Sequence, residues 1–141
     1  MPVTIRRFVF AAILAVWLAS LAQPVAITQR GTPYDGFAIG FIGPLGMLIG
    51  HFGWWANLWL PVAVIRGWRG SAQRTQHPSI DHVIGIVLTL LTINSLFWND
   101  IPTDAGSDRI VRYGLGYHLW LAAVAGAGIA TLYERIRRKP R

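Results

Sequence analysis

Two histidines and two asparagines are the side chains of this sequence that offer the clearest chemistry. His51 and His118 lie in separate hydrophobic stretches, at positions that would reach similar depths in a membrane, and two facing imidazoles can ligate the iron of haem b. Asn57 and Asn94 bring uncharged amides into two such stretches. We take these four as candidate ligand-binding residues, and a haem b or quinone-linked redox role is one function that they would serve.

Asn57 also belongs to a stripe of small residues on one predicted helix face. Helical spacing places four residues on that face: Gly50, Gly53, Asn57 and Pro61. Since Pro61 has no N–H group, it leaves the backbone carbonyl of Asn57 without its helical partner. We expect the hydroxyl of Thr89 or Thr92 to donate to that carbonyl or to the Asn57 amide, which would link two helices. The alternative is that Asn57 lines a path for a substrate or an ion.

Three aspartates, Asp100, Asp104 and Asp108, are spaced four residues apart between two hydrophobic stretches. In a helix this spacing would align their carboxylates for a divalent ion. Pro102 and Gly106 disfavour a helix at this place, so we expect a solvated loop.

Patterns typical of enzymes are missing from the sequence. It has no cysteine, no His-Glu-x-x-His pair, no nucleophile elbow and no phosphate-binding loop. We therefore expect a protein that is not an enzyme, with no metal site and no cofactor other than the haem alternative.

The elements that would position these residues follow from the composition. Charged residues form 13% of the 141 residues, about half of the ~25% typical of soluble domains, and apolar and aromatic residues form 53%. The sequence has four uncharged gaps: 8–29, 36–65, 82–99 and 113–133. Because about 20 apolar residues cross a bilayer as a helix, the gaps predict an all-α membrane protein. We expect a compact bundle of four transmembrane helices that forms one domain over residues 1–141.

The predicted spans cover about 8–24, 47–65, 82–98 and 114–133. The second gap is too long for one crossing, because its 30 residues would make a helix of about 45 Å against a hydrocarbon core of about 30 Å. Its early glycines and Pro44 predict that residues 37–46 form an interfacial or kinked lead-in. Small residues along the spans, Gly126 among them, predict close packing between helices.

The distribution of basic residues predicts the orientation of the spans. Ten of the thirteen lysines and arginines fall in the N-terminus, the middle loop and the tail, which share one side of a four-span protein. The positive-inside rule places that side, and both termini, in the cytoplasm. The basic tail, residues 135–141, is expected to contact anionic lipid headgroups. We expect no nucleic-acid partner, since no soluble module remains to present a basic face.

Residues 1–22 have a second interpretation. A basic start, a short apolar stretch and Ser20-Leu21-Ala22 also fit a secretory signal with a small-x-small cleavage site. Its removal would leave three spans.

Two short stretches resemble those of a known group of proteins. Trp54-Trp55-Ala56-Asn57 and Gly116-Tyr117-His118-Leu119-Trp120-Leu121-Ala122 are similar to segments of small, uncharacterised bacterial membrane proteins with four spans. The resemblance implies four spans and a bacterial inner membrane, and it brings no activity, substrate or cofactor with it.

Taken together, these features favour a small non-enzymatic accessory protein that packs with a membrane partner or with itself. The redox component described above is one alternative, and a small homo-oligomeric channel or pore is another. Fold class does not decide among these functions.

Overall fold

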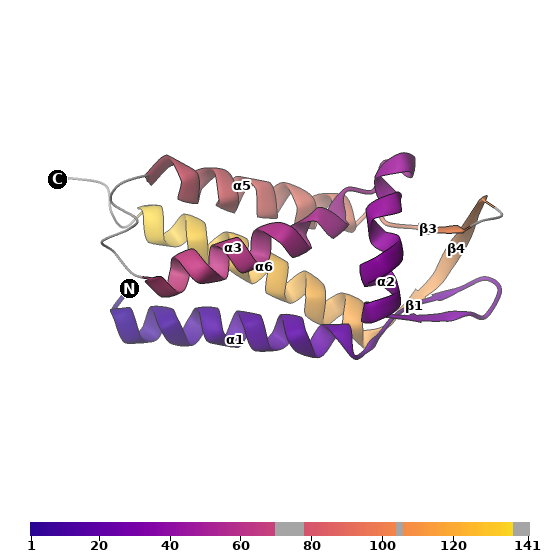
Figure 1. Ribbon diagram of the computed structural model, residues 1–141, viewed down its shortest axis with the longest axis horizontal. Helices are drawn as coiled ribbons and strands as arrows, with labels where there is room; N and C mark the ends of the chain where they lie inside the picture. Colours follow the sequence, from indigo (N-terminus) through magenta and orange to yellow (C-terminus); the bar gives the residue numbers. More distant parts are fainter. Residues whose placement is uncertain (70–77, 104–105, 137–141) are drawn as a thin grey trace.

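A computed structural model of the chain describes residues 1–69, 78–103 and 106–136. Four helices run side by side along the long axis of the molecule, and a small sheet lies at one end of them (Figure 1). The helices are α1 (Val3–Leu21), α3 (Ala56–Arg69), α5 (Pro78–Ser95) and α6 (Leu115–Ile136). α6 packs against α1 and α5, so it holds the bundle together.

The core of the bundle consists of aliphatic side chains and one aromatic ring. Phe10, Leu60, Leu88 and Val124 come from the four different helices, and each is almost completely buried. Glycines let the helices approach closely, since a Cβ on Gly85 would lie 2.7 Å from the Leu132 side chain. Gly85 therefore lies where α5 and α6 pack closely together.

Gly126 faces α1 more loosely. A Cβ placed on this residue would lie 3.7 Å from Ile13 Cγ1, which is an ordinary contact distance. Gly126 thus lies at the interface between α6 and α1, with room for a methyl group.

A second group of elements crosses the sheet end of the bundle. α2 (Gly36–Ile42) continues into the 3-10 helix η1 (Gly43–Ile49), and η2 (Gly53–Trp55) leads into α3. Asp35 caps α2, because its Oδ1 accepts a hydrogen bond of 2.7 Å from the Ala38 N–H. Gly50 ends η1 with a φ of +84°, a conformation that glycine adopts without strain.

The sheet has four antiparallel strands in the order β2-β1-β4-β3. They are β1 (Pro24–Thr28), β2 (Pro33–Asp35), β3 (Asp100–Thr103) and β4 (Gly106–Tyr113). Ile27 of β1 pairs with Arg112 of β4, so the central pairing joins two distant parts of the chain. The inner face of the sheet contributes Val25, Ala26 and Ile101 to a second, smaller core.

The prediction of an all-α bundle of four membrane spans is wrong. The segments that were expected to be polar loops hold the four strands, and β3 pairs with β4 where a solvated loop was expected. Of the three aspartates there, Asp104 lies outside the described residues. Asp108 is buried, and Asp100 pairs with Arg109 across β3 and β4. Strand pairing satisfies the backbone polar groups of these segments, which explains the sheet.

The predicted second span, residues 47–65, is also wrong in its bounds. The positive φ of Gly50 interrupts the helical conformation, so α3 begins only at Ala56 and has 14 residues. Gly50 and Gly53 lie before this helix, and they do not share a helical stripe with Asn57 and Pro61. Residues 37–46, expected as an interfacial or kinked lead-in, form α2 and the start of η1.

Two helices of the described part of the chain are long and apolar enough to cross a membrane, α1 and the Leu115–Tyr133 part of α6. With 1.5 Å per residue, the 19 residues of α1 span about 28 Å, close to the thickness of a hydrocarbon core. The side chains of the basic tail, residues 135–141, lie outside the described part, so their contact with headgroups stays a prediction.

An ion pair joins α3 and α5 at the end of the bundle opposite the sheet. Arg66 Nε donates to Asp81 Oδ1 at 2.7 Å, and the two side chains are 20% and 10% exposed. We expect Asp81→Asn to lower the free energy of unfolding by about 1 kcal/mol, since the amide keeps an acceptor but loses the charge. Unfolding of the wild type, Asp81→Asn, Arg66→Gln and the double variant in mixed micelles measures this coupling. If the free energy of unfolding changed equally with salt concentration in the wild type and in Asp81→Asn, the result would contradict this prediction.

Candidate functional site

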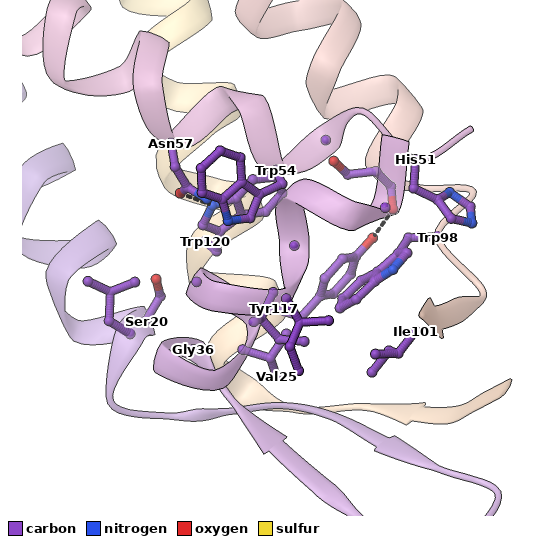
Figure 2. A pocket seen from close by; sticks show the side chains of 18 of the residues that line it. Ser20, Val25, Gly36, His51, Trp54, Asn57, Trp98, Ile101, Tyr117 and Trp120 are labelled. Atoms are coloured by element: carbon purple, nitrogen blue, oxygen red, sulfur yellow. Dashed lines mark hydrogen bonds between the residues drawn. The ribbon is translucent and has the colours of Figure 1, made fainter. Parts of the chain in front are cut away.

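We call α2 and η1, residues 36–49, the crossing segment. A cavity lies where the bundle, this segment and the sheet meet (Figure 2). Its volume is about 200 Å³. The end of α1, the start of α6, the crossing segment α2–η1 and strand β3 each contribute to its wall. An engineered apolar cavity of about 150 Å³ binds benzene, so this space is large enough for one substituted ring.

Aromatic rings form much of the cavity wall. The lining includes Trp17, Trp54, Trp98, Tyr117 and Trp120. Indole and phenol rings give large apolar surfaces with a polar edge, which suits the boundary between a hydrocarbon core and water. Among the described residues, the lining has no aspartate, glutamate, lysine or arginine, so the cavity favours a neutral occupant.

Asn57 is the polar centre of this wall. Its Oδ1 accepts one hydrogen bond from Trp17 Nε1 at 2.9 Å and another from Trp120 Nε1 at 2.8 Å. The two tryptophans belong to α1 and α6, so the amide ties three helices together. Figure 2 shows the bond between Asn57 and Trp120 beside the cavity.

The expected partners of Asn57 lie elsewhere. The hydroxyl of Thr89 donates to the Gly85 carbonyl and that of Thr92 to the Leu88 carbonyl, each at 2.8 Å and within α5. A threonine hydroxyl in a helix readily bonds the carbonyl four residues earlier, and here that local bond replaces the predicted interhelical one. Asn57 therefore links helices through the indole N–H groups of Trp17 and Trp120, and not through a threonine hydroxyl.

Asn94 holds the crossing segment to the end of α5. Its Oδ1 accepts hydrogen bonds from the Phe52 N–H at 2.7 Å and the Gly53 N–H at 3.1 Å, and its Nδ2 donates to the Gly50 carbonyl at 3.3 Å. These three bonds occupy the oxygen and one N–H of the Asn94 amide within the protein. Asn94 lines the cavity, but its observed role is structural.

Two glycines let the crossing segment and η2 close over the cavity. A Cβ on Gly43 would collide with the Trp54 ring, and a Cβ on Gly53 would collide with Ser95 Oγ. The backbone at Gly43 therefore lies directly against an indole. A larger residue at Gly43 would push the crossing segment away from η2, and one at Gly53 would push η2 away from the end of α5.

Trp98, Tyr113 and Tyr117 form an aromatic cluster next to the cavity. The rings of Tyr113 and Tyr117 are stacked, with centroids 4.4 Å apart, and Tyr117 Oη donates to the Ser95 carbonyl at 2.8 Å. Tyr113 Oη donates to the Trp98 carbonyl. Burial, and to a lesser degree the negative charge of Asp100, raises the pKa of Tyr113.

The raised pKa of Tyr113 predicts a loss of stability in alkali. As the pH rises, the Tyr113 phenol ionises in the unfolded state before it ionises in the folded state. The stability that the neutral phenol contributes is therefore complete below about pH 10 and is lost as the pH rises through the folded-state pKa. We expect Tyr113→Phe to lose less stability than the wild type between about pH 9 and pH 11. Unfolding in mixed micelles at the two pH values measures the difference, and an equal loss in both proteins would contradict the prediction.

The two histidines do not meet in the cavity. His51 is half-buried and lines it, whereas His118 is exposed, lies outside the lining and packs edge-on against Tyr117 at 5.4 Å between ring centroids. A space of about 200 Å³ is also too small for a porphyrin. The geometry therefore gives no support to a haem held between His51 and His118. Within the described residues, no cluster of three potential metal ligands occurs.

Comparison with protein-family models, with curated proteins and with solved structures finds no match to this chain. The cavity must therefore be interpreted from its own residues. Sequence reasoning identified His51, Asn57 and Asn94 but missed the four tryptophans. Trp98 lies at the end of an apolar stretch, where an ordinary interfacial anchor is also expected. The other three lie well inside such stretches, so their positions gave no separate signal.

Proposed function

We propose that this protein is a non-enzymatic membrane protein of accessory type that binds a small apolar molecule in its aromatic cavity. The observation that carries the proposal is the cavity itself, which combines a volume of about 200 Å³, tryptophan walls and an uncharged lining. Binding sites for small molecules are typically concave and apolar, with a few placed polar groups. Asn57 is such a group here.

The outer surface of the bundle supports a location in the membrane. Large apolar side chains are exposed on each of its four helices, among them Phe8, Leu58, Leu90 and Ile129. In water such a surface would be an aggregation hazard, whereas in lipid it is the expected exterior. We propose that α1 and α6 cross the bacterial inner membrane and that the sheet lies outside the hydrocarbon core.

The ends of the chain support one orientation. The start of α1 and the end of α6 lie at the same end of the bundle, away from the sheet, and so does the end of α3 with Arg66 and Arg69 (Figure 1). The positive-inside rule then places this end in the cytoplasm. The sheet would face the periplasm.

Single cysteines test this orientation cleanly, since the chain has none of its own. Gln29 and Thr4 are both exposed and lie at opposite ends of the molecule. A membrane-impermeant maleimide should label Gln29→Cys in intact spheroplasts and Thr4→Cys only after permeabilisation. The reverse pattern would overturn the orientation, and equal labelling of both before permeabilisation would overturn the membrane location.

The tryptophans themselves report on binding. In ¹H–¹⁵N spectra of the protein in micelles, titration with ethylbenzene should shift the indole signals of Trp17, Trp54 and Trp120 until they saturate. Trp68 is exposed and lies outside the cavity, so it serves as the control and should change only in proportion to the ethylbenzene in the micelle. Proportional change in all the indole signals would overturn the proposal.

A second candidate function is association with a membrane partner or with a second copy of the chain. The crossing segment carries large exposed side chains, of which Phe41 is 85% exposed and Leu48 is 74% exposed. Native mass spectrometry of protein purified in mild detergent should detect the complex, and Phe41→Ser should abolish it. Phe8→Ser, at a residue 74% exposed on α1, is the matched control. A monomer with no bound protein would count against this function and against a homo-oligomeric channel.

A further inference from the structure

The free hydrogen-bonding groups on the cavity wall are mainly donors. Asn57 Oδ1 accepts from Trp17 and Trp120, and an indole N–H can only donate, so these two bonds fix which way the amide points. The Nδ2 group of Asn57 then carries two N–H donors. In the part of the chain that the structure describes, no acceptor bonds to them.

The indole of Trp54 adds no donor to the cavity space. Its ring lines the cavity, but its Nε1 is buried without an acceptor among the described residues, at the ring edge that packs against Gly43. A group in the cavity therefore does not reach this N–H.

The hydroxyl groups of the lining add no free donors either. Ser20 donates to the Trp17 carbonyl at 2.6 Å, Ser95 to the Leu91 carbonyl at 2.7 Å, and Tyr117 to the Ser95 carbonyl. Their protons are already used within the protein. Among the described lining residues, Asn57 Nδ2, Trp98 Nε1 and one ring N–H of His51 remain as donors without a partner in the protein.

We propose that the cavity binds a neutral planar ring that carries a carbonyl group, with the carbonyl oxygen accepting a hydrogen bond from Asn57 Nδ2. The ring fits the volume and the aromatic walls, and its neutrality fits a lining without charged residues. This inference rests on the proposed function, because it names the class of molecule that the same cavity selects.

Two probes of nearly equal shape isolate the carbonyl. Acetophenone and ethylbenzene differ by a C=O group in place of a CH₂ group, and titration of the purified full chain in micelles gives a dissociation constant for each. The ratio of the two constants cancels general changes in the cavity. Asn57→Asp removes the amide donors while keeping an acceptor for the two indoles.

We expect Asn57→Asp to weaken the binding of acetophenone about fivefold relative to ethylbenzene, the effect of one net hydrogen bond. Trp68→Phe changes a side chain away from the cavity, and its ratio should equal that of the wild type. Saturable binding of both probes with a ratio that Asn57→Asp does not change would overturn the carbonyl inference and leave the proposed function standing. Failure of both probes to saturate the wild type would overturn both.

Discussion

Gly36→Ala is expected to destabilise the fold by about 3 kcal/mol, the upper part of the range for overpacking. A Cβ at this position would lie 2.5 Å from Leu21 Cα and 2.6 Å from the Leu21 carbonyl oxygen. Both are backbone atoms, so no side-chain rotation relieves the clash. The turn from α1 into the sheet and the start of α2 would have to separate, and the cavity would open.

Gly40→Ala is the matched control for this change. Gly40 lies in the same helix and also lines the cavity, but a Cβ there meets nothing within 4 Å. Since alanine is a better helix former than glycine, this variant should gain up to about 1 kcal/mol. Unfolding of both variants in mixed micelles gives the comparison. Equal stabilities for the two variants would show that α2 does not pack on the backbone of Leu21.

Asn57→Leu is expected to have the second large effect, a loss of about 2 to 4 kcal/mol. The leucine fills a similar volume but leaves the Trp17 and Trp120 N–H groups without their acceptor, and each unpaired buried donor costs about 1–3 kcal/mol. The link among α1, α3 and α6 would be lost. The free energy of unfolding and the indole signals of the two tryptophans measure the effect.

Asn57→Asp separates the hydrogen bonds from other properties of the side chain. It keeps an oxygen for both indole groups, so it should lose clearly less stability than Asn57→Leu. Full stability of Asn57→Leu would mean that water or another group satisfies the two indoles, and it would remove Asn57 from the centre of the site.

Apolar stretches located the long helices of the bundle but not the sheet. The predicted spans 8–24 and 114–133 overlap α1 and α6, because a run of apolar residues of that length marks a helix whatever covers it. The strands are short, β1 lies within an uncharged gap, and the strand pairing joins residues as distant as Ile27 and Arg112. Such pairing depends on the tertiary fold and leaves no local pattern.

The candidate site was predictable only in part, because its contacts also join residues that lie far apart in the sequence. Asn57 stands out because an amide within an apolar stretch needs a partner. Its partners are 40 and 63 residues away, and only the packing of α1 and α6 against α3 brings Trp17 and Trp120 to it. The local bonds of Thr89 and Thr92 compete with any interhelical bond, and a sequence does not reveal which bond wins.

The hydrogen bonds to Asn94 couple the exchange of two backbone amides to the opening of α5. The amides of Phe52 and Gly53 lie in a short connection outside any long helix, where amide protons normally exchange within a short time. Because both donate to Asn94 on α5, they exchange only when the end of that helix detaches. Hydrogen exchange at these two amides should therefore follow the opening of α5 rather than local fraying, which makes the crossing segment and α5 one cooperative unit.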